Sequence, residues 1–558
     1  MCAGASNPSQ QPEKETVAPV GVRRDGAMSR NNRAAGGPAD APRAGAEIEL
    51  KLQGTPEVLE SLLEQPAIRA RLVGRPAVQR LENIYYDTAD QRLRRHGFAF
   101  RVRKRGRQYV QTLKSDDAGG LVAYRGEWQT PLASPEPDLA LLPAGALEAL
   151  NGLVEADELR PVFATLVRRQ VRRLETGNGA GRSLVEAALD LGAIEARGQR
   201  LPIAELELEL LEGPAEGVYL LALQLDAASP LHVETRSKSM RGYAFAAGEP
   251  PPWQKAPPLA LARDASVEDA FGTILRTCLQ HWCVNEAAAL DGRDPEGVHQ
   301  MRVGLRRLRS AIALFGRLVA PERRAWLDAG PERIIGALGP ARDWDVFLTQ
   351  SLAPVLAARP EDASLVALRE AAEGERQRGY EAARAAIGAP DYTRTMLELG
   401  HWIEAAGWRE QPSRRGAAWF GRPIVDFAHH LLAKRHKKAL RLGKDFAALP
   451  PPKRHRLRIA LKKLRYAAEF FEGLYGRKRT RPYLGALKGL QDALGHLNDV
   501  AVAESLTAGL IGRAETAPRA LALGSGMVLG WLARGQAEVE PRTQTAWQHF
   551  VDRKPFWD

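Results

Sequence analysis

A proline-rich segment divides this chain into two parts that have different hydrophobic periods. Residues 248–258 contain five prolines in 11 positions, which favours a stiff, extended linker. Before it, over 46–247, apolar and polar residues mainly alternate with a period of two, as in strands that bury one face. After it the apolar residues recur with the 3.6-residue period of helices. The sequence therefore predicts an α+β multidomain protein with a β-rich domain followed by an all-α domain.

The composition of the two ends completes the expected domain organisation. The first 45 residues are rich in Ala, Gly, Pro, Ser, Asn and Arg and show no periodicity, which indicates a disordered tail. The 558 residues are then divided into five segments: a tail over 1–45, the β-rich domain over 46–247, the linker over 248–258, the helical domain over 259–540 and a C-terminal tail over 541–558.

Cysteine usage and hydropathy exclude several classes of protein. Three cysteines without a CxxC pair exclude a disulfide framework and a structural zinc site, and they fit a reducing compartment. The longest uncharged run, 520–533, has 14 residues, whereas a membrane helix needs roughly 20. The N-terminal segment lacks an apolar core followed by a cleavage site, so no secretory signal is expected. We therefore expect a cytoplasmic protein without a membrane partner.

The helical part contains an internal repeat with a constant offset of 156 residues. The pattern HxxRxxxRRxR that begins at His299 returns as HxxRxxxKKxR from His455. The same offset, without gaps, relates Gly339 to Gly495 and Asp343 to Asp499. Chance does not preserve a register over such a span, so the sequence predicts a duplicated helical unit.

Charged residues in the β-rich part are arranged by strand face. Residues two apart share a face, so each of the following sets points one way: Glu47, Glu49 and Lys51; Arg101 and Arg103; Thr112 and Lys114; Arg125 and Glu127; Glu186 and Asp190; and Glu205, Glu207 and Glu209. Each set alone could be the solvent face of an ordinary antiparallel strand. However, stacked like charges repel one another unless a ligand compensates them. Clustered carboxylates suit Mg²⁺ or Mn²⁺, and clustered Arg and Lys suit phosphate.

These residues resemble the CYTH, or triphosphate tunnel metalloenzyme, family. The match begins with the ExExK pattern Glu47-x-Glu49-x-Lys51 and continues in order over about 200 residues. It includes Tyr85-Tyr-Asp-Thr88, Arg101-x-Arg103, Thr112-x-Lys114, Arg125-x-Glu127, Leu189-Asp190-x-Gly192, Glu205-Leu-Glu-Leu-Glu-Leu210 and Ser237-Lys238-x-x-Arg241-Gly-Tyr243. The resemblance implies an eight-stranded antiparallel tunnel that binds a triphosphate and hydrolyses it with Mg²⁺ or Mn²⁺.

Carried over by position, the resemblance assigns roles to these side chains. The catalytic residues would be Glu47, Glu49, Lys51 and Glu205, and the metal ligands would be Glu47, Glu49, Asp190, Glu207 and Glu209. The triphosphate would be held by Arg101, Arg103, Lys114, Arg125, Lys238 and one of Arg168 and Arg169. Many relatives place a basic residue and a tryptophan where this chain has Leu166 and Arg172. The choice between Arg168 and Arg169 as the arginine that enters the tunnel is therefore open, and Arg169 is preferred.

The expected reaction is hydrolysis of inorganic triphosphate to diphosphate and phosphate. One alternative is a class IV-type adenylyl cyclase, and another is a thiamine or nucleoside triphosphatase. A further alternative is a non-catalytic protein that only binds polyphosphate.

One face of each repeated helix is basic. His299, Arg302, Arg306 and Arg309 fall within about 80° of one another around a helix, separate from an apolar arc that includes Met301 and Leu305. Such a face could be solvated, but like charges three and four positions apart destabilise a helix unless an anion compensates them. Asp343 and Asp499 are interpreted as partners that orient the arginines.

This half, over roughly 265–535, resembles the CHAD family of helical domains built as two related halves. The resemblance rests on Val298-His-Gln-Met-Arg302 through Arg309 and on Leu457 through Tyr466, and it implies binding of inorganic polyphosphate and an association with polyphosphate granules. The expected polyphosphate-binding residues are His299, Arg302, Arg306, Arg307, Arg309, His455, Arg458, Lys462, Lys463 and Arg465.

The net charge of +12 lies in one segment of the helical half. Residues 434–465 contain 13 basic residues and one acid, and the rest of the chain has 66 of each. Nucleic acid is a rival partner, because basic surfaces bind any phosphate backbone. Single-strand binders also carry aromatic residues for base stacking, and Phe446 is the only Phe, Tyr or Trp in this segment. Polyphosphate is therefore the preferred partner, and nucleic acid is not expected.

Overall fold

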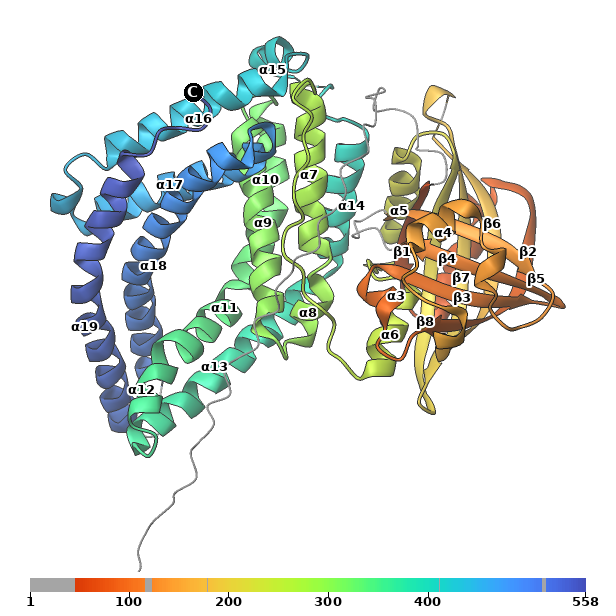
Figure 1. Ribbon diagram of the computed structural model, residues 1–558, viewed down its shortest axis with the longest axis horizontal. Helices are drawn as coiled ribbons and strands as arrows, with labels where there is room; N and C mark the ends of the chain where they lie inside the picture. The colour runs from red at the N-terminus through yellow and green to blue at the C-terminus, as the bar shows by residue number, and fades with distance from the viewer. Residues whose placement is uncertain (1–45, 116–122, 178, 411, 514–517) are drawn as a thin grey trace, which may run out of the picture. The chain divides into compact units, whose positions relative to one another are not determined.

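The computed structural model describes residues 46–115, 123–177, 179–410, 412–513 and 518–558. Within these ranges, side chains are described except at 46–47, 123–125, 180, 451, 496–499 and 536–539. The predicted tail over 1–45 lies outside the described residues. Figure 1 shows strands and short helices up to α6 and only helices after it, so the predicted change from β-rich to all-α is confirmed.

The strands form one antiparallel sheet. They are β1 (Ala46–Gln53), β2 (Leu72–Asp87), β3 (Phe98–Arg105), β4 (Gln108–Ser115), β5 (Ala123–Leu132), β6 (Arg160–Thr176), β7 (Ser183–Ala196), β8 (Gln199–Glu212) and β9 (His232–Val233). The order is β5-β4-β3-β2-β6-β7-β8-β1-β9, and β1 also pairs with β5. The sheet has nine strands, whereas eight were predicted, because the two-residue β9 adds to β1.

The two faces of the sheet differ in polarity as the alternation predicts. Leu50 and Leu52 of β1 and Leu206 and Leu208 of β8 are buried in one apolar cluster. This cluster includes apolar side chains of the helices α1 (Pro56–Glu64) and α5 (Glu216–Ala228). The charged residues that alternate with these leucines therefore face away from α1 and α5, toward the other side of the sheet. The remaining helices of this domain are α2 (Pro66–Arg69), α3 (Arg92–Arg95), α4 (Ala144–Leu150) and α6 (Lys238–Ala247).

The second part of the chain is helical. Its elements are α7 (Val267–Cys283), α8 (Glu286–Asp291), α9 (Pro295–Phe315), α10 (Pro321–Ala337), α11 (Gly339–Val346), α12 (Ala353–Ala358), α13 (Ala363–Ile387), α14 (Pro390–Glu404), α15 (Arg414–Trp419), α16 (Ile424–Leu442), α17 (Pro451–Phe471), α18 (Arg477–Arg513) and α19 (Pro518–Val551). In Figure 1, α9 lies beside α7, and α18 lies beside α19. No helix among the described residues is long and apolar enough to cross a membrane.

Helix α9 shows why the basic stripe faces away from the core. Asp294 caps its first turn by accepting a hydrogen bond from the amide of Glu296, and Pro295 occupies the first helical position. Met301 and Leu305 are buried, as the predicted apolar arc requires. Helices α9 and α17 each have 21 residues and begin 156 residues apart, which matches the offset of the sequence repeat.

The C-terminal residues belong to the folded helical part rather than to a tail. The predicted boundary at 541 falls inside α19, which continues to Val551. Phe550, Phe556 and Trp557 are buried and contact Tyr483 of α18 through their rings. Aromatic side chains of this size bury much apolar surface, which ties the segment to the helical core. The expected linker over 248–258 has no regular secondary structure, and the Trp253 indole donates a hydrogen bond to Asp294 (2.7 Å).

Candidate active site and helical phosphate pocket

Strand register brings three carboxylates together on the polar face of the sheet. Asp190 of β7 lies directly opposite Glu205 of β8, and Glu207 follows two positions along the same strand. One carboxylate oxygen from each lies within 4.8 Å of the others, and all three residues are buried. The alternation in β8 placed Glu205 and Glu207 on one face, but only the pairing with β7 brings Asp190 to them.

Three cations already neutralise this acidic cluster. The Lys238 ammonium lies 2.6 Å from Asp190 and 2.7 Å from Glu207, and it also contacts Glu205. The Arg169 guanidinium donates two hydrogen bonds to Asp190 (2.8 and 2.6 Å) and also pairs with Glu207, while Arg241 pairs with Glu205. Burial alone raises the pKa of Glu207, but Lys238 and Arg169 hold that pKa well below its usual value.

A second group of carboxylates lies in the next row of the sheet, where the ion pair between Arg173 and Glu186 is longer (3.7 Å). Glu209 lies opposite Glu49 of β1 on one side and Glu186 of β7 on the other. Burial, Glu49 and Glu186 raise the pKa of Glu209 to about 7. The Lys51 ammonium is 3.2 Å from Glu49 and lies opposite Glu207. Glu209, whose pKa is raised, and the adjacent carboxylates Glu49 and Glu186 form a donor set that a divalent cation stabilises.

Charge balance favours a metal ion at Glu49 and Glu209 over the cluster of Asp190, Glu205 and Glu207. In that cluster, a cation would compete with the Lys238 ammonium, which already contacts all three carboxylates. Beside Glu209, a cation would instead relieve the repulsion that raises its pKa. The oxygen-only donor set in this row fits a hard cation such as Mg²⁺ or Mn²⁺.

The cationic side of the site is formed by β3, β4 and β6. Arg101 lies 3.7 Å from Glu127 and 3.4 Å from the Tyr85 hydroxyl, and Lys114 lies 2.6 Å from Glu127. Arg103 donates a hydrogen bond to Asn83 (2.9 Å). Repulsion from Arg101, together with burial, lowers the pKa of Arg103 to about 9.

Neighbouring arginines of β6 face opposite sides of the sheet. Arg169 points into the charged site, as its contacts with Asp190 show. Arg168 lies 3.4 Å from Glu60 of α1, and Arg172 pairs with Glu64 of the same helix. Arg168 therefore lies outside the charged site, and Arg169 is the arginine that enters it.

Not every predicted residue of this domain has a described side chain. In the register of β1 and β5, Glu47 lies opposite Arg125, but both side chains lie outside the described set.

The role of Arg241 was not predicted. Arg241 follows Lys238 by three positions on α6, so the helical period places both on one face toward the carboxylates. Gly242 lets α6 pack closely against Phe163 of β6, since a Cβ at this position would lie 2.1 Å from the Phe163 ring.

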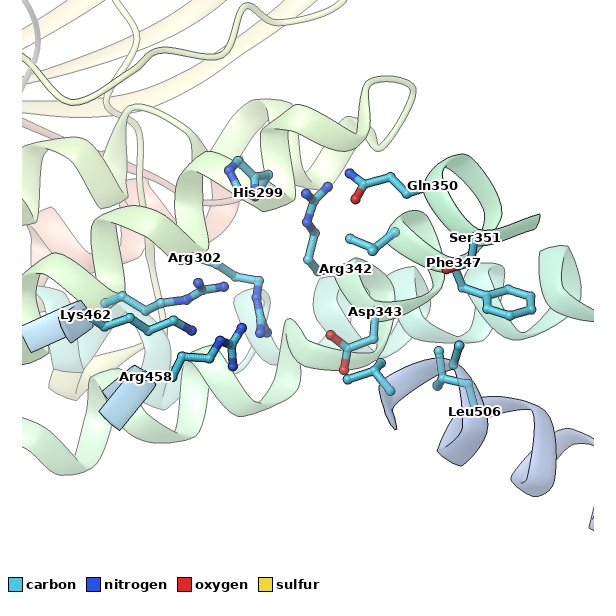
Figure 2. Close-up of a pocket in the computed structure, with 14 residues that line it drawn as sticks. His299, Arg302, Arg342, Asp343, Phe347, Gln350, Ser351, Arg458, Lys462 and Leu506 are labelled. Carbon is cyan, nitrogen blue, oxygen red and sulfur yellow. The ribbon is translucent and has the colours of Figure 1, made fainter. Parts of the chain in front are cut away.

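A pocket of about 390 Å³ in the helical domain gathers the predicted basic residues into one place (Figure 2). We call it the α9 pocket. His299, Arg302 and Arg306 come from α9, whereas Arg458 and Lys462 come from α17. Its other polar lining residues are Arg342 and Asp343 of α11 and Gln350 and Ser351 of the π-helical turn Phe347–Leu352. The pocket therefore combines residues from both copies of the repeated pattern.

The electrostatics of the α9 pocket favour an anion. Burial and repulsion from Arg306 lower the pKa of Arg302 to about 10, although Asp343 opposes this shift. Burial and nearby Arg342 lower the pKa of His299 to about 4, so the imidazole is neutral at pH 7. The His299 Nδ1 and the Arg302 Nε are buried and have no hydrogen-bond partner within the described part of the chain. The influence of Asp343 on Arg302 agrees with its predicted orienting role; the Asp499 side chain is not described.

The structure separates the other predicted basic residues from the α9 pocket. Arg307 is buried beside Glu469 (3.5 Å) and the Phe470 ring, Arg309 pairs with Asp328 (2.7 Å) and Glu332 (2.8 Å), and Arg465 pairs with Glu469 (2.8 Å). His455 and Lys463 are exposed and do not line it. Conversely, Arg342 was not predicted, because it lies 33 residues beyond the HxxRxxxRRxR pattern and no local signal marked it.

Comparison with known proteins assigns each half of the chain to a domain family. Residues 45–243 match the CYTH domain family, and residues 273–508 match the CHAD domain family. A solved CHAD domain from the plant Ricinus communis is 34% identical; the match covers 53% of this chain and 96% of that one, with a TM-score of 0.47.

Solved structures also resemble the N-terminal half. A putative adenylyl cyclase from Hippeastrum, described as having a dominant triphosphatase activity, is 21% identical over 36% of this chain and 96% of its own, with a TM-score of 0.27. A putative adenylate cyclase from Bacillus halodurans is 22% identical over 35% of this chain and 98% of its own, with a TM-score of 0.25. The two family matches confirm the predicted resemblance: the chain contains a CYTH domain, which is a triphosphate tunnel metalloenzyme domain, followed by a CHAD domain.

Proposed function

We propose that the CYTH domain hydrolyses inorganic triphosphate to diphosphate and phosphate in a metal-dependent reaction. The observation that carries the proposal is the division of the buried site into an acidic and a cationic side. Glu49, Glu207 and Glu209 lie on adjacent positions of β1 and β8, while Arg101 and Arg103 lie on β3. This division suits a metal-bound phosphate chain, whose charge requires cations on one side and a carboxylate-held metal on the other.

Each side of the proposed site has a distinct task. Arg101, Arg103 and Lys114 would hold the non-reacting phosphates and stabilise the charge that develops on the leaving diphosphate. Glu49 and Glu209, with Glu47, would hold Mg²⁺ or Mn²⁺, while Glu207 borders this row and pairs with Lys238. When bound, such an ion neutralises the terminal phosphate and lowers the pKa of a water. A glutamate of this acidic row would accept the proton of the attacking water.

The cations within the acidic cluster of Asp190, Glu205 and Glu207 have a positioning task. Arg169 and Lys238 contact the carboxylates directly, so these side chains are fixed before substrate arrives. Preorganised charges cost little reorganisation during the reaction. The repulsion that lowers the pKa of Arg103 also involves Arg169, so an anionic substrate beside both would relieve it.

A panel of substrates tests the proposed reaction. We expect phosphate release from inorganic triphosphate with Mg²⁺ or Mn²⁺ and none after chelation, because the acidic row alone cannot neutralise the terminal phosphate. ATP and thiamine triphosphate serve as comparison substrates. Cyclic AMP formed from ATP, without phosphate release from triphosphate, would contradict the proposal and favour the adenylyl cyclase alternative. Faster hydrolysis of ATP or thiamine triphosphate would favour the corresponding triphosphatase alternative.

We propose in addition that the CHAD domain binds inorganic polyphosphate in the α9 pocket. Support comes from the five cationic side chains and the neutral His299 that line it with Asp343, together with the buried Arg302 Nε, which has no hydrogen-bond partner among the described residues. Polyphosphate supplies closely spaced anionic oxygens that guanidinium groups bind with charge-assisted hydrogen bonds. A polymer held beside a hydrolase of phosphate chains would also raise the local substrate concentration.

Charge removal in the α9 pocket tests polyphosphate binding. We expect Arg302→Ala/Arg306→Ala to weaken polyphosphate binding by roughly tenfold or more, because two charged hydrogen-bond donors are lost. The matched control is Arg309→Ala/Arg465→Ala, which removes two arginines of the same helices that pair with carboxylates outside the pocket. Calorimetric titration with polyphosphate, with chelator present, measures the affinity of both variants. Equal losses in the two variants would contradict an assignment to the α9 pocket, and displacement by RNA at equal charge concentration would contradict the preference for polyphosphate.

A further inference from the structure

A second basic pocket lies at the junction of α9, α10 and α15. It has a volume of about 670 Å³ and shares no lining residue with the α9 pocket. Arg317 follows α9, Arg324 comes from α10, and Arg414 and Arg415 begin α15. We call it the α10 pocket. The four arginines that line it lie outside both copies of the repeated pattern.

Within the part of the chain that the structure describes, the arginines of the α10 pocket have no acidic partner. The side chains of Arg317, Arg324, Arg414 and Arg415 are exposed and make no ion pair or hydrogen bond within the described ranges. Among the described lining residues Asp328 is the one acid, and both of its oxygens accept hydrogen bonds from Arg309 (2.7 and 2.9 Å). The pocket therefore carries a strong positive charge that the protein does not compensate.

Cations of α16 and α17 extend this charge. Burial and repulsion from Arg317 lower the pKa of Arg435 to about 10. Burial and repulsion from Arg435, Lys438 and Arg324 likewise lower the pKa of Lys463. The arginines of the α10 pocket thus repel cations of residues 434–465, the segment that holds the net charge of the chain. Arg435 is partly buried, so its charge is screened less than that of a fully solvated cation.

The two basic pockets lie close enough for one polymer to reach both. Arg306 lines the α9 pocket, and α9 ends at Phe315, nine residues or about 14 Å of helix rise further along and two residues before Arg317. On α17, Lys462 lines the α9 pocket, and the next residue, Lys463, belongs to the second cluster. Arg309, which follows Arg306 by three positions on α9, pairs with Glu332 and with Asp328, which itself lines the α10 pocket.

We propose that the α10 pocket is a second phosphate-binding site, which takes a further segment of the polyphosphate chain that occupies the α9 pocket. This inference rests on the polyphosphate binding proposed above. Linking two sites through one polymer makes the second contact intramolecular, so long chains gain affinity that short chains cannot reach. The α10 pocket would thereby make the CHAD domain selective for chain length.

Chain-length dependence tests the proposal on the full-length protein. The variant is Arg317→Ala/Arg324→Ala, and the control is Arg323→Ala/Arg369→Ala, which removes two arginines outside both pockets. Calorimetric titration with long-chain polyphosphate and with tripolyphosphate, both with chelator, measures affinity. We expect the variant to lose roughly tenfold in affinity for the long chain and none for tripolyphosphate, while the control retains both. Circular dichroism confirms that the variants are folded.

Each other outcome has a distinct meaning. Unchanged long-chain affinity in the variant would overturn the proposal. An equal loss for tripolyphosphate would also overturn it, because the pocket would then bind short free phosphate compounds rather than a chain segment. An equal loss for single-stranded RNA would overturn the assignment to polyphosphate. If the wild-type protein binds no polyphosphate, or if Arg302→Ala/Arg306→Ala leaves its binding unchanged, the proposed polyphosphate binding in the α9 pocket itself fails. This result differs from loss of the chain-length effect alone.

Discussion

Replacing Arg169 by Met should lower kcat/KM for triphosphate by roughly 10²–10³-fold, whereas Arg168→Met should leave it unchanged. The two residues are adjacent on β6 and carry the same charge. Arg169 donates two hydrogen bonds to Asp190 in the buried site, but Arg168 faces α1 and lies 3.4 Å from Glu60. The variant removes a preorganised cation from the site, while the control removes an exposed one. Phosphate release from triphosphate with Mg²⁺ measures the rate of both variants.

The Arg169 experiment distinguishes a catalytic effect from loss of fold. Breaking the pair with buried Asp190 leaves that carboxylate with Lys238 alone, which costs stability of roughly 3–5 kcal/mol. Thermal unfolding of both variants therefore accompanies the kinetics. A folded Arg169→Met protein with the wild-type rate would contradict the placement of this arginine in the active site. Equal losses for Arg168→Met would contradict the division of β6 into two faces.

The acidic row gives the other large expected effect. Glu49→Gln/Glu209→Gln should abolish metal-dependent phosphate release, by roughly 10³-fold or more, because the variant removes two of the proposed metal ligands. Since the amides are isosteric with the carboxylates, the variant should fold, and thermal unfolding checks the loss of the Glu49–Lys51 pair. Glu212→Gln, at the exposed end of β8, is the matched control and should have the wild-type rate.

Metal binding without substrate separates ligand loss from a general loss of activity. Titration of Mg²⁺ or Mn²⁺ into the wild-type protein should show binding that Glu49→Gln/Glu209→Gln loses and Glu212→Gln keeps. Asp190→Asn should weaken this binding much less, because Asp190 is already paired with Lys238 (2.6 Å) and with Arg169. If Asp190→Asn alone eliminated metal binding and the double variant did not, the metal would belong to the buried cluster of Asp190, Glu205 and Glu207.

The sequence predicted the fold class and much of the site because both depend on local patterns. Alternation in β1 and β8 fixes which side chains share a face, and burial of Leu50, Leu206 and Leu208 shows that the apolar face packs against helices. In α9 the 3.6-residue period separates the buried Met301 from Arg302, which lines the pocket. A face of a strand or helix is set by positions within one element, and the sequence contains that information directly.

The distances between elements were beyond reach of the sequence. Arg307 and Arg309 belong to the predicted basic motif, yet partners from α17 and α10 hold them outside the α9 pocket. Arg342 has no motif of its own and enters the pocket because α11 lies beside α9. An ion pair depends on two residues far apart in the chain, so the helical period cannot say which arginine remains available for a ligand.

By itself, the sequence determined the two-domain division, the two families and the sidedness of each charged strand and helix. These features follow from the periods of two and 3.6 and from ordered motifs within each domain. Only the tertiary structure decided how the charges are balanced: that Lys238 and Arg169 neutralise the cluster of Asp190, Glu205 and Glu207, that Glu209 remains poorly compensated, and that the helical cations form two pockets. Coulombic interactions act between neighbours in space, and strand register and helix packing set those neighbours.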